Sequence, residues 1–433
     1  MPESNDPGTK LDEKRQFINE KIVKQPMTRR QIASRLLAFF FVAVVFGIVA
    51  AVSFAVSRPI AVRYLGGETA MPESSISFPK DEPSENVLAS DDETTEPIEK
   101  VVQSAVEQYR YSVVDVDSLY TALRNLAQDV DKGIVLVHSV QQEVDWFDNP
   151  VETTGQYAGV VIASTRRELL ILTPEAVAEK SDAIKVMFSD GTEVDGRIKQ
   201  KDQMYGMAVV SVDINSVEED TWKTVTTLPL GNSYTMKQGD FVVAIGGPAG
   251  VVHSIDYGLV SYVMRNVQMT DGVGRALYVN VNADIETGTF LVNTSGELIG
   301  WVTDQLQTED NSASMPRVFG ISDYKAALAR MTNGQGIPYF GIRGQEVAQV
   351  PASSVLPQGV YVQNVVIDGP AYNGGIQNGD IITRMNDETI VTMKDFLAVM
   401  ENQESGQVIH VIVQRFGRDQ YAQLEFQVTL GTR

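Results

Sequence analysis

The sequence predicts a mainly β protein with one N-terminal transmembrane helix and two folded parts of unequal size. Three observations lead to this fold class. An uncharged apolar run at residues 36–56 predicts a transmembrane helix over residues 36–57, short β-rich segments fill residues 111–332, and a smaller pattern of strands and short helices follows over residues 333–433. Short strands with turn signals between them are typical of an all-β sandwich or a pair of barrels. The last part is predicted to be an α+β module.

The apolar run is long enough to cross a bilayer. Its sequence, LLAFFFVAVVFGIVAAVSFAV, contains no charge, and about 20 such residues span roughly 30 Å of hydrocarbon as a helix. Lysines and arginines are frequent in residues 21–35, whereas only Arg58 and Arg63 follow closely. The positive-inside rule therefore predicts that residues 1–35 are cytoplasmic and that the C-terminal domains of this single-pass protein are extracytoplasmic. A cleaved signal peptide is the alternative, but the run exceeds a typical signal h-region and no A-x-A-like site follows closely.

The composition of the chain predicts a linker and limits the partners, metals and cofactors that we expect. Residues 58–110 are rich in Glu, Asp, Ser, Pro and Thr, which predicts an acidic disordered linker with too little apolar surface to order itself. The formal net charge of −21 argues against nucleic acid as a partner, because a phosphate backbone would repel it. The chain has no cysteine, and its histidines are His138, His253 and His410 alone, so we expect no metal site and no cofactor.

Residues 111–332 are predicted to begin with one helix and to continue as strands. Val116–Val130 places leucines at helical spacing, which indicates a short amphipathic helix. A second helix is expected over Ser322–Met331, followed by a hinge at residues 332–336. The expected strands between the helices are Gly133–Val140, Gly159–Ala163, Leu169–Thr173, Ile184–Ser189, Glu193–Lys199, Met207–Val212, Phe241–Ile245, Gly258–Val263, Leu277–Val281 and a hairpin over residues 290–300.

The smaller C-terminal part combines strands with short helices. Gly359–Val366 is expected to be a strand and Met393–Met400 a helix. Val408–Gln414 and Gln420–Leu430 are expected to pair across a turn at residues 416–419 as a return hairpin.

The order of these parts resembles the HtrA/DegP family of extracytoplasmic serine proteases. That family joins a signal anchor, a trypsin-like double β-barrel and a C-terminal PDZ domain. The stretch GVYVQNVVIDGPAYNGGIQNGDIITRMNDETI is very similar to the family's PDZ pattern, while MFSDGTEVDGRI, AIGGPAG, YGLVS and FLVNTSGELIG resemble its barrel segments in matching order. The resemblance covers about residues 119–433. It implies a trypsin-like protease domain over residues 111–332 and a PDZ domain over residues 333–433.

The resemblance also implies three catalytic positions, and this chain departs from the family at each. Ala176 stands where the family has its catalytic His, and Gly206 stands where it has the Asp that orients the His. The nucleophile loop Gly-Asn-Ser-Gly-Gly is matched by residues 285–289, with Thr287 at the position of the Ser. A hydroxyl needs an adjacent base to become a nucleophile, and neither Ala176 nor Gly206 can supply one. Glu286 would place a negative charge where an oxyanion should form. We therefore expect a degenerate, catalytically silent domain.

The PDZ part keeps more of the family's binding apparatus. The stretch PYFGIRG at residues 338–344 matches the family's carboxylate-binding loop, whose backbone N–H groups would hold the C-terminal carboxylate of a peptide. Side chains of the helix at residues 393–400 would close the groove, although core packing explains them almost as well. The predicted peptide-binding residues are Tyr339, Phe340, Gly341, Ile342, Phe396 and Met400.

Together these features predict a membrane-anchored HtrA-like pseudoprotease that binds peptides or C-termini of envelope proteins. It would serve as a scaffold, adaptor or regulator in protein quality control. One alternative is an active serine-type endopeptidase with a rearranged site, in which His253 supplies the base for Thr287. Another is a structural envelope protein whose PDZ domain is vestigial. Family members are commonly trimers, but the trimer-forming N-terminal segment is poorly matched, so a homo-oligomer is one of the possible states.

Overall fold

The computed structural model describes residues 75–82, 113–144, 150–179, 181–306, 315–347 and 356–433. The chain divides into two units, residues 1–73 and residues 74–433, and every described residue belongs to the second unit. The predicted cytoplasmic segment and transmembrane helix therefore lie outside the described residues. None of the helices in the described ranges combines the length and the apolar character that crossing a membrane requires.

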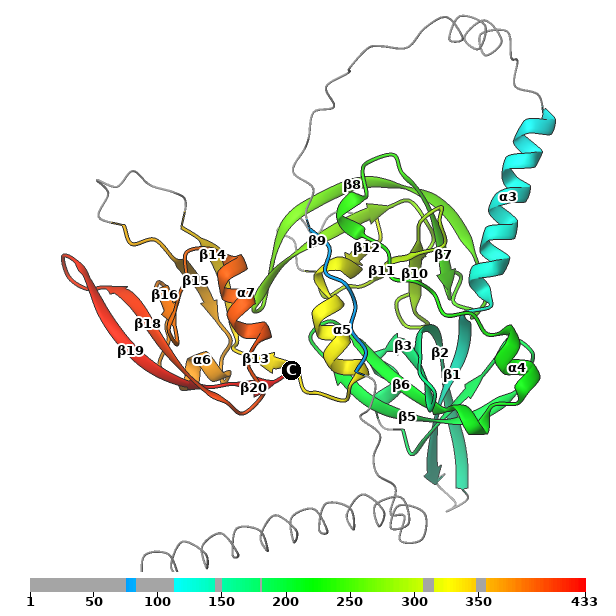
Figure 1. Cartoon of the computed structure of the whole chain (residues 1–433), viewed down its shortest axis with the longest axis horizontal. Coiled ribbons are helices and arrows are strands. Elements are labelled where there is room, and N and C mark those ends of the chain that lie inside the picture. Colours follow the sequence, from blue (N-terminus) through cyan, green and yellow to red (C-terminus); the bar gives the residue numbers. More distant parts are fainter. Residues whose placement is uncertain (1–74, 83–112, 145–149, 180, 307–314, 348–355) are drawn as a thin grey trace, which may run out of the picture. The chain divides into compact units, whose positions relative to one another are not determined.

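Two closed antiparallel barrels make up the larger part of the described chain (Figure 1). The strand order is β1-β2-β3-β6-β5-β4 in the first barrel and β10-β11-β12-β9-β8-β7 in the second. These barrels confirm the mainly β fold class. The first contains β1 (Ile134–Val144), β2 (Pro150–Ser164), β3 (Glu168–Pro174), β4 (Ala183–Met187), β5 (Glu193–Asp202) and β6 (Met207–Asp213). The second contains β7 (Phe241–Gly246), β8 (Asp256–Met269), β9 (Gly272–Val279), β10 (Thr289–Val292), β11 (Leu298–Val302) and β12 (Arg317–Gly320).

Strand β3 shows why the barrels pack against each other. Successive side chains of a strand point to opposite faces, and both faces of β3 are buried. Leu169 and Ile171 fill the interior of the first barrel. Leu170 and Leu172 join a core that also contains Ile245 of β7 in the second barrel. The end of β3 is thereby fixed at the seam between the two barrels.

Helices flank the barrels. The predicted first helix is present as α3 (Val113–Asp131), but only its C-terminal end is buried, at Ala127 and Val130, while Leu119 remains 59% exposed. The predicted closing helix is present as α5 (Lys325–Thr332), which follows the 3₁₀ turn η4 (Ile321–Asp323). The remaining short helices of this part are η1 (Glu175–Ala178), η2 (Ile214–Ser216), α4 (Glu219–Thr224) and η3 (Ser233–Thr235).

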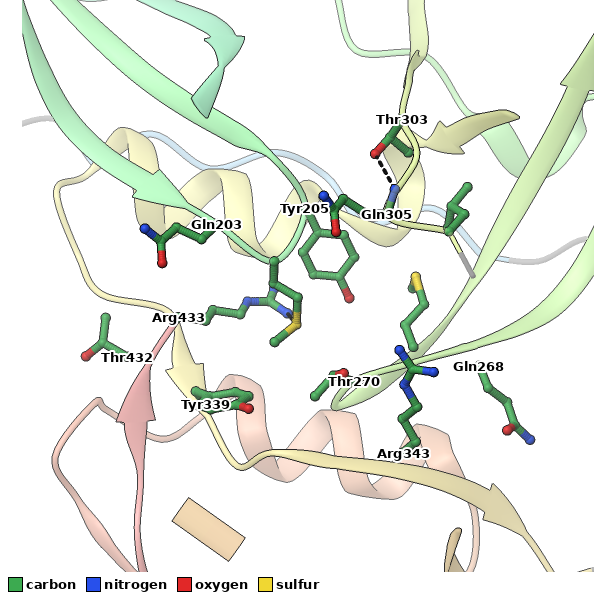
Figure 2. A pocket seen from close by; sticks show the side chains of 13 residues that line it. Gln203, Tyr205, Gln268, Thr270, Thr303, Gln305, Tyr339, Arg343, Thr432 and Arg433 are labelled. Atoms are coloured by element: carbon green, nitrogen blue, oxygen red, sulfur yellow. Dashed lines mark hydrogen bonds between the residues drawn. The ribbon is translucent and has the colours of Figure 1, made fainter. Parts of the chain in front are cut away.

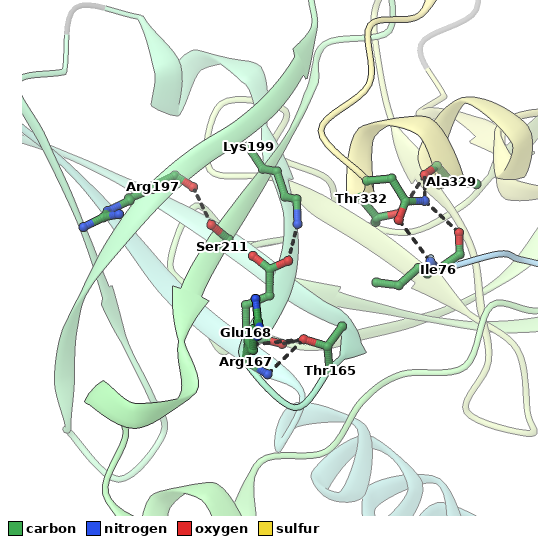
Figure 3. A network of polar contacts seen from close by, with 10 residues as sticks. Ile76, Thr165, Arg167, Glu168, Arg197, Lys199, Ser211, Ala329 and Thr332 are labelled. Atoms are coloured by element: carbon green, nitrogen blue, oxygen red, sulfur yellow. Dashed lines mark hydrogen bonds and ion pairs between the residues drawn. The ribbon is translucent and has the colours of Figure 1, made fainter. Parts of the chain in front are cut away.

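Residues 75–82 differ from the prediction of an unbroken disordered linker. Ile76 and Phe78 pack against the core that the barrels share. The backbone of Ile76 makes two hydrogen bonds with the Asn333 side chain, at 3.0 and 2.8 Å, beside the end of α5 (Figure 3). Asp81 forms an ion pair with Lys325 at 2.8 Å. Two apolar side chains and one acidic side chain thus anchor an otherwise polar stretch, which we name the strap.

The C-terminal module is an α+β domain, as predicted. Its main sheet has the order β14-β15-β16-β18-β19, with β17 paired to β16, so β14 is an edge strand. Thr392 begins α7 with a capping box, in which its side chain and that of Asp395 exchange bonds with backbone N–H groups. The elements are β13 (Pro338–Tyr339), β14 (Ile342–Glu346), β15 (Val360–Val365), α6 (Pro370–Asn373), β16 (Ile381–Met385), β17 (Glu388–Thr389), α7 (Met393–Glu401), β18 (Val408–Phe416), β19 (Tyr421–Thr429) and β20 (Gly431–Thr432).

Candidate functional site

A cavity of about 210 Å³ opens at the seam between the barrels, where β3 and β6 of the first barrel face the loop before β10. Ala176 lines it from η1, and Gly206 lines it from the turn that precedes β6. Glu286 lines it from the loop before β10. The structure therefore brings together two of the three positions singled out from the sequence, and neither carries a side chain that can transfer a proton.

Thr287 lies beside this cavity but is not among the residues that line it. Its methyl group packs against Gly247, where an added Cβ would lie only 2.3 Å from Thr287 Cγ2. Its backbone N–H donates to Asp284 Oδ1 at 2.6 Å, and its carbonyl oxygen accepts from the Ala158 N–H at 2.7 Å. Among the hydrogen bonds described for this chain, Thr287 takes part through its backbone alone.

The cavity also contains a carboxylate that the sequence did not draw attention to. Glu175, next to Ala176, is 8% exposed, and its N–H donates to the Gly206 carbonyl oxygen at 2.8 Å. Its carboxylate pairs with Lys201 Nζ at 3.0 Å. This pairing occupies one of the two oxygen atoms of the carboxylate.

The histidines are placed away from the cavity. His253 Nδ1 lies 3.0 Å from Asp131 Oδ1 at the end of α3. His138 and His410 belong to strands β1 and β18, as predicted. None of the three lines the cavity.

The predicted carboxylate loop connects β13 to β14. Gly341 has φ +91°, a conformation that favours glycine, and an added Cβ would meet Tyr339 Cζ at 3.2 Å. In this conformation three successive N–H groups point to one place. Phe340 N–H donates to Asp271 Oδ2 at 2.7 Å, Gly341 N–H to both carboxylate oxygens at 2.8 and 2.9 Å, and Ile342 N–H to Oδ1 at 2.9 Å. The loop is therefore built to hold a carboxylate, and it holds one from the chain itself.

Asp271 belongs to the turn between β8 and β9 of the second barrel, and only 6% of it is exposed. Burial raises the pKa of its carboxyl group, while the three N–H groups and the charge of Arg433 oppose this rise. Its φ of +56° lies in the left-handed region, which Asp tolerates better than most residues. In the sequence, Thr270-Asp271-Gly272 indicates a turn and nothing more, because its partners are about 70 positions away.

Phe396 and Met400 lie in the core of the PDZ-like module, with exposed fractions of 0% and 5%. The Phe396 ring contacts that of Phe340, with centroids 5.6 Å apart. The groove side of α7 instead presents Leu397, which is partly buried, and an added Cβ at Gly272 would lie 3.6 Å from Leu397 Cδ2. Of the two explanations offered for Phe396 and Met400, the structure thus favours core packing. Leu397 was missed because one step along a helix turns the side chain by about 100°.

A second cavity, of about 390 Å³, adjoins the carboxylate loop. Figure 2 shows Thr270, Tyr339 and Arg343 among its lining side chains, together with Tyr205 and Arg433. Residues of both the barrels and the C-terminal module therefore enclose it.

Comparison with known proteins supports both parts of the fold. A trypsin-like peptidase domain matches residues 158–300, and a PDZ domain matches residues 332–414. The chain is 26% identical over 287 residues to a serine protease Do-like HtrA of Lactobacillus helveticus, covering 62% of this chain and 68% of that protein. It is also 26% identical over 268 residues to a serine endoprotease DegS of Haemophilus influenzae, covering 60% of this chain and 74% of that protein.

A probable periplasmic serine endoprotease DegP-like of Pseudomonas savastanoi is 29% identical over 297 residues, and the chain spans 57% of its length. Among solved structures, the HtrA-type protease AlgW with decapeptide has the same fold, with a TM-score of 0.51 and 20% identity, over 72% of this chain and 98% of that one. The described residues of this chain thus form a trypsin-like serine protease domain and a PDZ domain of the HtrA/DegP type.

Proposed function

We propose that this chain is a membrane-anchored, catalytically silent HtrA-like protein that binds peptides or C-termini of envelope proteins through its PDZ domain. Its role is that of a scaffold, adaptor or regulator in protein quality control. The observation that carries the proposal is the convergence of the N–H groups of Phe340, Gly341 and Ile342 on one carboxylate. The structure of AlgW with a decapeptide is consistent with peptide binding by a protein of the same fold.

We expect no catalysis because the cavity at the seam between the barrels lacks the side chains that activate a nucleophile. Ala176 and Gly206 offer no base and no group to orient one, and Glu175, paired with Lys201, replaces neither. Thr287 is turned toward Gly247.

The oxyanion-stabilising donors are compromised as well. In trypsin-like enzymes the N–H of the nucleophile residue stabilises the developing oxyanion. Here the corresponding N–H of Thr287 donates to the Asp284 carboxylate. Glu286 adds a second negative charge at the cavity. Both carboxylates oppose the charge that a tetrahedral intermediate would develop.

The test of silence uses the full chain, unfolded casein and a fluorophosphonate probe. We expect no cleavage and no labelling. The matched control is Thr287→Ala, which should give the same background. Cleavage or labelling by the parent that disappears in Thr287→Ala would show an active endopeptidase with a rearranged site.

The test of peptide binding compares decapeptides that differ only at the C-terminus. Free acids should bind in the micromolar range, which corresponds to about −8 kcal/mol, and the C-terminal amides should bind more weakly. Gly341→Asp adds a Cβ and a negative charge at a position with φ +91° and should abolish the preference for the free acid. Equal binding of acid and amide by the parent would contradict the carboxylate-loop assignment.

The membrane anchor and the orientation rest on residues 36–57 and on the charges that flank them. External protease added to spheroplasts should digest the part of the chain after residue 66. Protection of that part until the membrane is lysed would reverse the orientation.

A further inference from the structure

The turn between β8 and β9 occupies the peptide groove in the manner of a ligand. The carboxylate of Asp271 fills the position that the loop would offer to a peptide's terminal carboxylate, at N···O distances of 2.7–2.9 Å. The Asp271 N–H also donates to the Ile342 carbonyl oxygen at 2.7 Å. The turn therefore satisfies both the donors of the loop and the first acceptor of β14.

The neighbours of Asp271 extend this arrangement along the groove. Thr270 forms an antiparallel bridge with Arg343, on the edge of β14 that β15 leaves free. A peptide that binds by strand addition would use the same edge. On the other side of Asp271, Val273 packs against the PDZ core, and Gly272 approaches Leu397 of α7. One carboxylate, one β-bridge and one apolar side chain thus reproduce the parts of a bound peptide end.

We propose that the β8–β9 turn is an intramolecular ligand that closes the PDZ groove, so that a peptide must displace Asp271 before it can bind. This inference rests on the proposed peptide-binding function of the same groove. It adds a regulatory step, because a peptide C-terminus can bind only when the turn is released. The carboxylate of the peptide then replaces that of Asp271 in the loop. The exchange also couples the groove to the second barrel, since β8 and β9 are neighbours in its closed sheet.

The exchange is feasible because Asp271 and the peptide C-terminus both offer a carboxylate to the loop. A tethered ligand acts at an effective concentration on the order of millimolar. A peptide displaces the turn once its own contacts outweigh those of the tethered carboxylate, and its apparent affinity is reduced by the fraction of molecules in which the groove is open. Removing the carboxylate of Asp271 should restore the intrinsic affinity.

The experiment measures binding of the full chain to a fluorescein-labelled pool of random decapeptides that end in valine, as free acids and as C-terminal amides. Asp271→Asn keeps the size of the side chain and tolerates positive φ but removes the charge. Asp271→Gly removes the side chain at the same backbone conformation. Both variants should bind the free acids at least tenfold more tightly than the parent and should bind the amides no better. Asp419→Asn, in the exposed β18–β19 turn, is the matched control for the charge change and should bind like the parent.

Hydrogen exchange provides a readout that needs no peptide. The amides of Phe340, Gly341 and Ile342 should be protected in the parent and should exchange faster in both Asp271 variants. If the variants keep that protection, or bind the free acids no more tightly than the parent, the intramolecular ligand is refuted while the proposed function stands. If neither the parent nor any variant prefers free acids to amides, the proposed function fails and the inference fails with it.

Discussion

The guanidinium group of Arg433 lies 3.3 Å from the carboxylate of Asp202, which links the residue that follows β20 of the PDZ domain to the end of β5 in the first barrel. Asp202 is fully buried and also accepts a hydrogen bond from the Tyr324 hydroxyl at 3.0 Å. The guanidinium lies over the Tyr205 ring, 4.6 Å from its centroid. Although burial opposes the charge of Arg433, the attraction of Asp202 and the two phenols raises its pKa above the usual value. The two domains therefore share a buried ion pair.

Removal of the positive member should be costly. Arg433→Met leaves the Asp202 carboxylate without its counterion, and breaking a buried pair in this way typically lowers the free energy of unfolding by about 3–5 kcal/mol. Urea unfolding of the full chain measures the change. Arg418→Met, at an exposed position of the β18–β19 turn, is the control and should change stability by about 0.5 kcal/mol or less. Equal effects of the two substitutions would contradict the role of the pair.

A second ion pair fixes the interior of the PDZ domain. Arg415 binds both oxygens of the buried Asp380 carboxylate, through Nε at 2.6 Å and Nη2 at 2.8 Å. Lysine keeps the charge but cannot make the two parallel bonds, so Arg415→Lys should lower the free energy of unfolding by about 1–2 kcal/mol. The control is Arg384→Lys on the exposed face of β16, which should have no measurable effect. Thermal unfolding of both variants beside the parent provides the comparison, and an unchanged Tm for Arg415→Lys would argue that the two bonds add nothing.

The stability of the second barrel should depend on pH through Asp323. Burial raises the pKa of this carboxyl group to about 6, against the hydrogen bonds from the Tyr234 hydroxyl and the Arg275 N–H. Because the pKa of Asp323 is higher in the folded state than in the unfolded state, the protonated carboxyl group stabilises the fold. This stabilisation is complete below about pH 4 and is lost as the pH rises through about 6.

The amide of Asp323→Asn cannot ionise, so this variant does not lose that part of its unfolding free energy as the pH rises. Between pH 4 and pH 7 the variant should gain about 2–3 kcal/mol of unfolding free energy relative to the parent, because each unit of pKa shift corresponds to about 1.4 kcal/mol. Urea titrations of both proteins at the two pH values measure the difference. A difference that stays constant with pH would show that the pKa of Asp323 is not raised.

The strap should open when Asp81 is removed. Lys325 is only 4% exposed and pairs with Asp81, so Asp81→Ala leaves a buried ammonium group that gains water if residues 75–82 detach. Hydrogen exchange of the strap amides should become faster, while that of the β3 and β10 amides should stay unchanged. Lys80→Ala is the control, because Lys80 is exposed and its surface pair with Glu401 contributes little. Strap amides that exchange alike in the parent and both variants would contradict the anchoring role of Asp81.

Most of the fold could be predicted because its signals are local. The alternation in β3 and the turn residues between strands indicate elements whose faces are buried on folding. The strap escaped prediction because its order depends on Asn333 and Lys325, far along the chain. The composition of residues 75–82 resembles that of their acidic surroundings, and only tertiary contacts set them apart.

The candidate sites show the same difference between features that a local motif predicts and features that depend on tertiary contacts. Ala176, Gly206 and the loop at residues 339–342 could be located by resemblance, because each lies within a short motif. The position of Thr287 against Gly247, the bond from its N–H to Asp284, and the occupation of the loop by Asp271 are three-dimensional facts. No motif in the sequence pairs Asp271 with Gly341.

The anchoring of the strap has a consequence for proteolytic processing. Residues 75–82 are attached to α5 through noncovalent contacts alone, made by Ile76, Phe78 and Asp81. A single cut between residues 82 and 113 would convert the strap into a bound peptide that still carries everything N-terminal to it. The two pieces would then separate only when the strap dissociates. The dissociation rate of the strap, and not the rate of cleavage, would therefore set the lifetime of the cleaved complex.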